Sequence, residues 1–495
     1  MPREHDPYDS VAYLSFPNPD THPDRLAAMA ILHGLNPAPV EQCRVLEMAC
    51  GDGANIIPMA YSMPKSEFVG FDLARLPIER GQDRIRALGL ENVRLFDADI
   101  LDAGSDLGQF DYIIAHGFYA WVPEPVRDRL LTLCGELLAP DGVAFVSYNA
   151  LPGGHLRKMI REMMLYHGKD IQDPIEQVSA SAAFLRFVIE TRPEGDPFRQ
   201  IMHDQLDKIE KRLPQHTFHD ELSEAYHPVL FSDFVDHAQR HGLQYLSEAT
   251  MPPPTDPCYR VDIRAKLEET ASNDIVKQEQ ALDFMRLRMF RETLLCRAER
   301  RLRRDSPAEH FRKLLFATRA ASTPAKAEGA KAYMLPDEGR MELNHPGAIA
   351  LIEALQSAWP RRLSLAEMAP ALSDAGFSLD SAGVTLLMRL IVSRFVEIHA
   401  WNPPVARQIS ERPKASACGR QDALRQPLAT TLLHGSLGLN DDFSRSFLLL
   451  VDGTRDRREL LEAMRVEFPS LSQKEIEFGI ESGLMDLHRV GMLEA

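Results

Sequence analysis

The chain of 495 residues contains the stretch Val45-Leu46-Glu47-Met48-Ala49-Cys50-Gly51-Asp52-Gly53. An apolar run that starts at Arg44 leads into this stretch, and two glycines close it. This order is typical of a buried strand that turns into a helix. Glycine lets the backbone adopt a positive φ and approach a ligand closely. The stretch therefore predicts a strand-to-helix turn at which a ligand binds.

Apolar runs recur along the first 152 residues, and amphipathic stretches lie between them. After Arg44–Ala49, the runs are Glu67–Phe71, Val93–Phe96, Phe110–His116 and Val143–Tyr148. The amphipathic stretches include Ile78–Leu88 and Pro125–Leu138. This alternation predicts an α/β fold with a Rossmann-like, doubly wound parallel sheet over residues 1–152. Such sheets bind ligands at the carboxyl ends of their strands.

The turn after the first run differs from a dinucleotide-binding turn. A G-x-G-x-x-G fingerprint would need a third glycine at position 56, where Ile56 stands. A carboxylate, Glu47, lies four residues before Gly51 instead. It would repel a pyrophosphate, whereas it suits the ammonium group of a methionine moiety. The turn therefore favours S-adenosylmethionine over a nicotinamide dinucleotide as the cofactor.

Two further acids follow the next two strands. Asp72 ends the second run, 19 residues after Gly53, where a carboxylate can accept hydrogen bonds from both ribose hydroxyls. Asp99 follows the third run, where it can meet the adenine amino group while Ile100 packs on the ring. Each acid alone could be a solvated loop residue or a helix N-cap. Three acids at three successive strand ends favour a nucleoside site.

Residues 8–165 resemble class I S-adenosylmethionine-dependent methyltransferases, and more narrowly bacterial methyltransferases that carry a regulatory domain. The segments that carry the narrower resemblance are Tyr8-Asp9-Ser10-Val11, Thr21-His22-Pro23-Asp24-Arg25-Leu26, His116-Gly117-Phe118-Tyr119-Ala120-Trp121-Val122-Pro123 and Ser147-Tyr148-Asn149-Ala150-Leu151-Pro152-Gly153. This group includes the rickettsial-type lysine methyltransferases that act on outer-membrane proteins. The resemblance implies S-adenosylmethionine as cofactor and a lysine side chain of a protein as methyl acceptor.

The resemblance also bears on individual cofactor-binding residues. Besides Glu47, Ala49, Gly51, Gly53, Asp72, Asp99 and Ile100, we assign Leu73 and Tyr13 to cofactor binding. Tyr13 belongs to an aromatic N-terminal segment that the resemblance implies as a lid, and inert packing along the sheet edge is the alternative. Ala49 stands where the family's acidic-x-Gly-x-Gly-x-Gly motif has its first glycine. Its methyl group is tolerable if φ is negative there, and weakens the site if φ is positive.

The end of the fourth run is where the methyl acceptor should lie. Methyl transfer needs orientation, desolvation and a deprotonated nucleophile rather than a strong acid–base pair. His116 or Tyr119 could accept a proton there, directly or through water. Trp121 and Tyr119 could enclose an ammonium group by cation–π contact. The alternative is that these rings pack under the following turn.

The rest of the chain divides into four predicted parts. They are a helical insertion over 153–227, a regulatory segment over 228–316, a winged-helix-like middle domain over 333–405 and a winged-helix-like C-terminal domain over 420–495. The regulatory segment should return to the sheet with strands Leu243–Ala249 and Cys258–Ile263, and then form one long helix from Asn273 to Asp305. A single separate helical domain over 153–310 is the alternative. Residues 317–332 read as a linker.

Composition limits the partners and the location. The formal net charge is −16, and the last helix carries an acidic face, so we expect protein contact and no nucleic acid. No apolar run is long enough to span a membrane. Six cysteines without a C-x-x-C pair indicate neither a disulfide framework nor a zinc site, and favour a cytoplasmic location. His237 and His241 lie four residues apart on an expected helix and read as solvated, so we predict no metal.

The sequence thus predicts an S-adenosylmethionine-dependent methyltransferase that acts on lysine side chains of a protein. A small-molecule O- or N-methyltransferase is one alternative, because a fold does not determine the acceptor. A non-catalytic scaffold with a degenerate cofactor site is the other, because of Ala49. The number of methyl groups added and the oligomeric state, a homodimer included, stay open.

Overall fold

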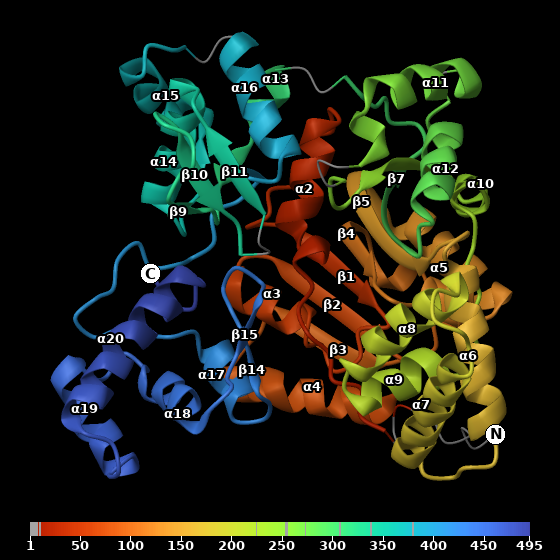
Figure 1. The fold of residues 1–495 in the computed structure, drawn as a ribbon, viewed down its shortest axis with the longest axis horizontal. Helices are drawn as coiled ribbons and strands as arrows, with labels where there is room; N and C mark the ends of the chain where they lie inside the picture. The colour runs from red at the N-terminus through yellow and green to blue at the C-terminus, as the bar shows by residue number, and fades with distance from the viewer. Residues whose placement is uncertain are drawn as a thin grey trace.

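A seven-stranded sheet forms the centre of the protein (Figure 1). The computed structural model describes residues 8, 11–223, 225–252, 256–272, 274–305, 308–336, 339–378 and 381–495. In spatial order the strands are β3 (Val93–Asp97), β2 (Glu67–Asp72), β1 (Arg44–Met48), β4 (Phe110–Ala115), β5 (Leu138–Asn149), β7 (Phe290–Arg297) and β6 (Leu243–Glu248). The first five are parallel, and β7 is antiparallel to both its neighbours. This order confirms the doubly wound sheet, and the strand order reverses between β1 and β4.

Both faces of the sheet are buried under helices, which explains why its strands read as nearly continuous apolar runs. On one face, Val45 packs in a core with α2 (Pro23–Leu32) and α3 (Ile56–Ser62). On the other face, Leu46 packs with α5 (Glu124–Leu137) and α10 (Phe231–Arg240). Successive side chains of a strand point to opposite faces, so one strand serves both cores.

Four helices cover the cavity end of the sheet and form the yellow to yellow-green group in Figure 1. They are α6 (Gly154–Gly168), α7 (Pro174–Glu190), α8 (Pro197–Glu210) and α9 (Pro214–Leu222). They share a small apolar core of their own, in which Ile160, Leu185 and Leu206 are buried. The insertion is therefore a packed unit that is rigid enough to form one wall of a site.

Two predictions for the regulatory segment are wrong. Cys258–Ile263 is no strand, because the chain there forms a short 3₁₀ helix and then α11 (Val261–Ala271). The long helix is interrupted, since α12 (Ile275–Arg286) ends and the chain continues as β7. Arginine, glutamate and leucine have high helix propensity, so the sequence of β7 predicts a helix. Pairing with β5 and β6 makes the segment a strand instead. Because β6 and β7 lie in the central sheet, 153–310 is not a separate helical domain.

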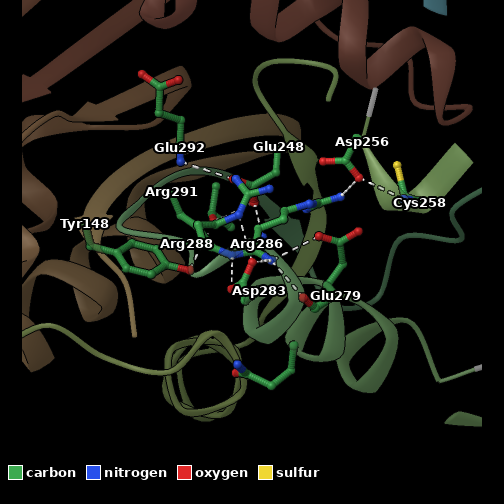
Figure 2. Close-up of polar contacts among 12 residues, drawn as sticks. Tyr148, Glu248, Asp256, Cys258, Glu279, Asp283, Arg286, Arg288, Arg291 and Glu292 are labelled. Carbon is green, nitrogen blue, oxygen red and sulfur yellow. Dashed lines mark hydrogen bonds and ion pairs between the residues drawn. The ribbon is translucent and has the colours of Figure 1, made fainter. Parts of the chain in front are cut away.

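A buried arginine accounts for much of the fit between α12 and β7. Figure 2 shows Arg291 on β7 directed at carboxylates from two other elements. Its guanidinium lies 2.8 Å from Asp283, 2.7 Å from Glu248 and 3.0 Å from Glu279. A buried cation is costly unless it is paired. The three carboxylates supply that pairing, and the two on α12 hold the helix on the strand.

The chain after β7 forms two smaller units, left of the sheet in Figure 1. The first combines β8 (Leu315–Ala317), β12 (Leu363–Ser364), β13 (Glu397–His399), the three strands β9–β11 (Ala321–Thr323, Lys331–Met334, Arg340–Leu343), and helices α14 (Pro346–Ala358), α15 (Leu365–Asp374) and α16 (Ser381–Val392). The second combines α17 (Ala417–Ala423), the hairpin β14–β15 (Leu428–Thr430, Ser436–Gly438), α18 (Asp442–Leu450), α19 (Arg457–Glu467) and α20 (Gln473–Arg489).

The predicted linker 317–332 is wrong in part, because it contains β9 and the start of β10. In the parts of the chain that the structure describes, no helix is long and apolar enough to cross a bilayer.

Candidate active site

A cavity of about 1020 Å³ opens at the carboxyl ends of β1, β2, β4 and β5. Its walls come from the N-terminal segment, from the loops after these strands, and from α6, α8 and α9. This is the edge at which doubly wound sheets bind ligands. The volume lies at the upper end for small-molecule sites, which leaves room for more than one reactant.

Glu47, at the end of β1, is the most unusual charge in the cavity wall. Its side chain is 4% exposed, and Asn55 Nδ2 donates a hydrogen bond of 2.7 Å to Oε1. Among the described residues, none donates to Oε2. Burial raises the pKa of this carboxyl to about 8, although the hydrogen bond from Asn55 acts in the opposite direction. A buried carboxylate with one unpaired oxygen suits a cationic ligand group.

The glycine-rich turn after β1 has left-handed backbone at three predicted positions. The φ angles are 58° at Ala49, 55° at Gly51 and 72° at Gly53. Glycine adopts this region freely, whereas an alanine there costs about 1–2 kcal/mol. The φ of Ala49 is therefore positive, which is the case in which we expected its methyl group to weaken the site. The turn carries local backbone strain beside the cavity.

Asp72, at the end of β2, fixes the geometry between two neighbouring loops. Its Oδ2 accepts the Gly51 N–H at 2.8 Å and its Oδ1 accepts the Ala74 N–H at 2.9 Å. A carboxylate has about four acceptor positions, so these bonds are compatible with further ones to ribose hydroxyls. Asp72, Leu73 and Tyr13 all line the cavity, as do Glu47, Ala49 and Gly51.

Three predicted cofactor residues do not line the cavity. A side chain at Gly53 would collide with Leu95 at 2.7 Å, so this glycine serves helix-to-sheet packing. Asp99 accepts the Leu101 N–H at 2.9 Å, which is the local turn contact given above as its alternative. Ile100 is buried in the core on the α5 side of the sheet. The contact of these three residues with the cofactor therefore stays a prediction.

His116 lies in the cavity wall after β4. Ser147 is buried and its Oγ accepts the Gly117 N–H at 2.7 Å, so its own proton points to His116 Nδ1 at 3.1 Å. Asn18 Nδ2 lies 3.5 Å from the same nitrogen. Enclosure lowers the pKa of His116 to about 4, so the ring is neutral and carries its proton on Nε2. A ring with so low a pKa is a weak base, and its role as a proton acceptor stays a prediction.

Tyr119 does not reach the cavity, which corrects its predicted catalytic role. Its side chain is 3% exposed in the core on the α5 side, where it meets Phe234 edge to face. Its hydroxyl lies 2.8 Å from Nδ1 of His237 on α10. The packing alternative holds for this ring.

Trp121 lines the cavity, but cations of the protein itself already lie on its ring. The guanidinium carbons of Arg157 and Arg161 on α6 lie 5.1 Å and 5.2 Å from its centroid. Arg157 is held by Glu221 on α9 through bonds of 3.1 Å and 2.7 Å. Trp121 therefore anchors the helical cover, and the structure does not support an open aromatic box for an ammonium group.

The N-terminal segment covers the cavity rather than the sheet edge. His216 and His219 on α9 donate from Nε2 to the carbonyls of Leu14 and Val11, each at 2.8 Å. The ring of Tyr13 lies 4.7 Å from that of His216. The i,i+3 histidines on α9 were a sequence signal for this contact, although their partners could not be read from it.

Asn149, at the end of β5, is a site residue that sequence reasoning missed. It is buried, it lines the cavity, and its Oδ1 has no hydrogen-bond partner among the described residues. The cavity thus holds two such orphaned oxygens, one on Glu47 and one on Asn149. An amide oxygen can accept a hydrogen bond from an amine, so this position suits the methyl acceptor.

Comparisons with known proteins agree with this geometry. Residues 45–142 match the family model of a methyltransferase domain, 214–297 that of a predicted methyltransferase regulatory domain, and 411–478 that of a PKMT C-terminal winged helix domain. Uncharacterized protein RP789 of Rickettsia prowazekii is 29% identical over an alignment 487 residues long, and the alignment covers 93% of this chain and 86% of that protein. Uncharacterized protein RP028 of the same species is 34% identical over 240 residues, which are 48% of this chain and 96% of that protein. PKMT2 from Rickettsia typhi, solved in complex with AdoHcy, has a TM-score of 0.88 at 25% identity over 97% of this chain and 99% of its own.

Proposed function

The chain belongs to the S-adenosylmethionine-dependent methyltransferases with a regulatory domain and a PKMT-type winged helix domain, and we propose that it methylates lysine side chains of a protein. The observation that carries the cofactor site is Glu47, a buried carboxylate whose Oε2 has no partner among the described residues. The likeness to PKMT2 over nearly the full length of both chains supports the protein substrate.

S-adenosylmethionine supplies a methyl group on a sulfonium, an electrophile that needs no acid catalyst. Glu47 holds the ammonium group of the methionine moiety, and Asp72 holds the ribose hydroxyls. Ala49 and Gly51 turn the backbone between these two carboxylates. Tyr13 and the segment around it close the cavity over this half of the site. The main contribution of these residues is orientation, which is worth about 7–11 kcal/mol in well-aligned reactions.

The acceptor half binds the amine that receives the methyl group. Asn149 Oδ1 accepts an N–H of that amine and so directs its lone pair away from β5. The amine loses its proton to water in the cavity, because the lowered pKa of His116 makes its ring a weak base. Asp220 and Glu221 on α9 also line this wall, where Arg157 and Arg212 pair with them.

Radioactive methyl transfer tests this function directly. Purified protein and tritiated S-adenosylmethionine are incubated with a bacterial outer-membrane fraction and a cytosolic fraction, followed by gel separation and mass spectrometry. We expect label in discrete protein bands and methylated lysine in their peptides. Label in low-mass material alone would indicate a small-molecule methyltransferase. If no fraction is labelled and the wild-type protein does not bind S-adenosylmethionine, the result would indicate a non-catalytic scaffold.

A further inference from the structure

A cluster of metal-ligand side chains lies away from the cavity, between α5 and the end of α10. Asp128, His237 and His241 place one ligand atom each within 4.8 Å of the others. The Nε2 atoms of His237 and His241 lie 3.1 Å and 3.0 Å from the same atom, Asp128 Oδ1. The two histidines point the same way because they are four residues apart on one helix. Their third partner comes from a segment 109 residues away, which the sequence could not show.

A hydroxyl group holds the far nitrogen of each ring. Tyr119 Oη lies 2.8 Å from His237 Nδ1, and Thr132 Oγ1 lies 3.2 Å from His241 Nδ1. In metal sites, a partner of this kind on the second ring nitrogen fixes the ring and the tautomer. A hydroxyl can accept from Nδ1–H, so each ring can lose its Nε2 proton to solvent, bind a metal through the Nε2 lone pair and keep its other hydrogen bond.

We propose that Asp128, His237 and His241 bind a divalent transition-metal ion of the Zn²⁺ type. Two imidazoles and one carboxylate are a ligand set that Zn²⁺ takes, with water completing the coordination. Water has access because the Asp128 side chain is 55% exposed. The ion would join α5 to α10, and α10 lies in the segment that matches the regulatory domain. Tyr119 is two residues from Trp121, so one hydrogen bond links this site to the cavity wall.

Metal titration of the full chain tests the proposal. The protein is stripped with EDTA, titrated with Zn²⁺ by calorimetry, and titrated with Co²⁺ while its visible absorption is recorded. We expect one ion per chain, at least tenfold weaker binding in His241→Ala and in Asp128→Asn, and about tenfold weaker binding in Tyr119→Phe. His203→Ala is the matched control, because His203 lies 3.4 Å from Asp207 on α8 and, among the described residues, no third ligand lies with them.

Two results would overturn the metal site. One is a wild-type chain that binds no Zn²⁺ at micromolar concentration, and the other is variant binding equal to wild type. Asp128 is exposed, so Asp128→Asn reports on the site even where a histidine variant fails to fold.

An independent observation concerns the back of the cofactor site. His434, between the strands of the hairpin β14–β15, is 4% exposed and donates from Nε2 to Asn55 Oδ1 at 2.9 Å. Asn55 Nδ2 donates in turn to Glu47 Oε1 at 2.7 Å. The Asn18 N–H also donates to Asn55 Oδ1, at 3.0 Å, which fixes the orientation of the amide. A chain of two hydrogen bonds therefore runs from the C-terminal unit to the carboxylate in the cavity.

His434 shows further signs of a fixed position. Its φ is 60°, an uncommon conformation for a residue with a side chain. Burial holds its pKa well below the usual range, so the ring is neutral and has one N–H to donate. Strained backbone persists only where the surroundings determine it, and it concentrates at functional sites.

We infer that His434 is a positioning residue for the methionine end of the cofactor. It fixes Asn55, and Asn55 holds Glu47 in line with the ammonium group. This inference rests on the proposed function of Glu47. It also assigns the C-terminal unit a part in cofactor binding, since that unit supplies the histidine.

Two ligands separate this role from a structural one. S-adenosylhomocysteine carries the amino-acid end, and 5′-methylthioadenosine lacks it. We expect His434→Ala to weaken S-adenosylhomocysteine at least tenfold and 5′-methylthioadenosine by less than threefold, and His434→Gln, which keeps an N–H donor, to recover part of the loss. Equal losses for both ligands, or no loss, would overturn the inference. If the wild type itself binds both ligands equally, the assignment of Glu47 fails instead.

Discussion

The two halves of the cavity are built from very different spans of sequence. The cofactor half takes Glu47, Ala49, Gly51, Asp72 and Leu73 from two adjacent strand ends. The acceptor half takes its wall from the loops after β4 and β5 and from helices α6, α8 and α9. A short span bears a recognisable pattern, whereas a wall assembled from distant segments does not. The comparison teaches that the cofactor is readable in the sequence and the acceptor is not.

The largest effect should follow from removing the ribose contact in the cofactor half. Asp72→Ala should weaken S-adenosylmethionine binding at least a hundredfold, because two charge-assisted hydrogen bonds are lost at about 1.5–3 kcal/mol each. Isothermal calorimetry measures the change. Asp99→Ala is the matched control, since Asp99 does not line the cavity and should alter binding by less than threefold. Equal losses in the two variants would mean that the cofactor extends to the end of β3.

The next effect belongs to the acceptor half. Asn149→Ala should lower kcat/KM for the acceptor by about tenfold or more, which is about 1.4 kcal/mol of transition-state stabilisation, because the amine loses the oxygen that orients it. Affinity for the cofactor should stay within threefold. A variant with normal transfer, or with equal loss of cofactor binding, would place Asn149 outside the acceptor site.

Trp121 also separates the two halves of the cavity, because it supports the acceptor wall without holding a ligand cation. Trp121→Ala should lower turnover about tenfold while changing cofactor affinity by less than threefold. Trp121→Phe should retain more activity, since a ring still packs against Arg157 and Tyr226. Melting temperatures of the folded variants serve as the control. Wild-type turnover in Trp121→Ala would show that the acceptor binds elsewhere.

The smallest effect concerns strain in the cofactor half. Ala49→Gly should raise the free energy of unfolding by about 0.5–1 kcal/mol, because relief of the positive φ exceeds the added entropy of the unfolded chain. Cofactor affinity should be unchanged or tighter. Ser272→Gly is a matched control, with a φ of 49° at a helix end remote from the cavity. A large loss of binding in Ala49→Gly alone would make Ala49 a fitted packing residue.

The same distinction between local and distant contacts governs how much of the fold could be predicted. Strands β1 to β6 follow from apolar runs, and β1 and β2 bring Glu47 and Asp72 together by parallel pairing alone. Strand β7 was missed because its pairing with β5 joins residues near 145 to residues near 294. His434 and Asn149 were missed for a related reason. A histidine 379 residues from its partner, or an asparagine whose Oδ1 has no hydrogen-bond partner among the described residues, leaves no pattern.

Proton release on cofactor binding tests the central claim, that Glu47 receives the ammonium group. In the free protein burial raises the pKa of Glu47 to about 8, so the carboxyl is mostly protonated at pH 7. A bound cation favours the ionised form and lowers that pKa, so binding should release close to one proton and strengthen as pH rises from 6 to 7. Calorimetry of S-adenosylhomocysteine in two buffers of different ionisation enthalpy measures this release. The account predicts release in the wild type, none in Glu47→Gln, and at least tenfold weaker binding in that variant; equal release or equal affinity in the two proteins would contradict it.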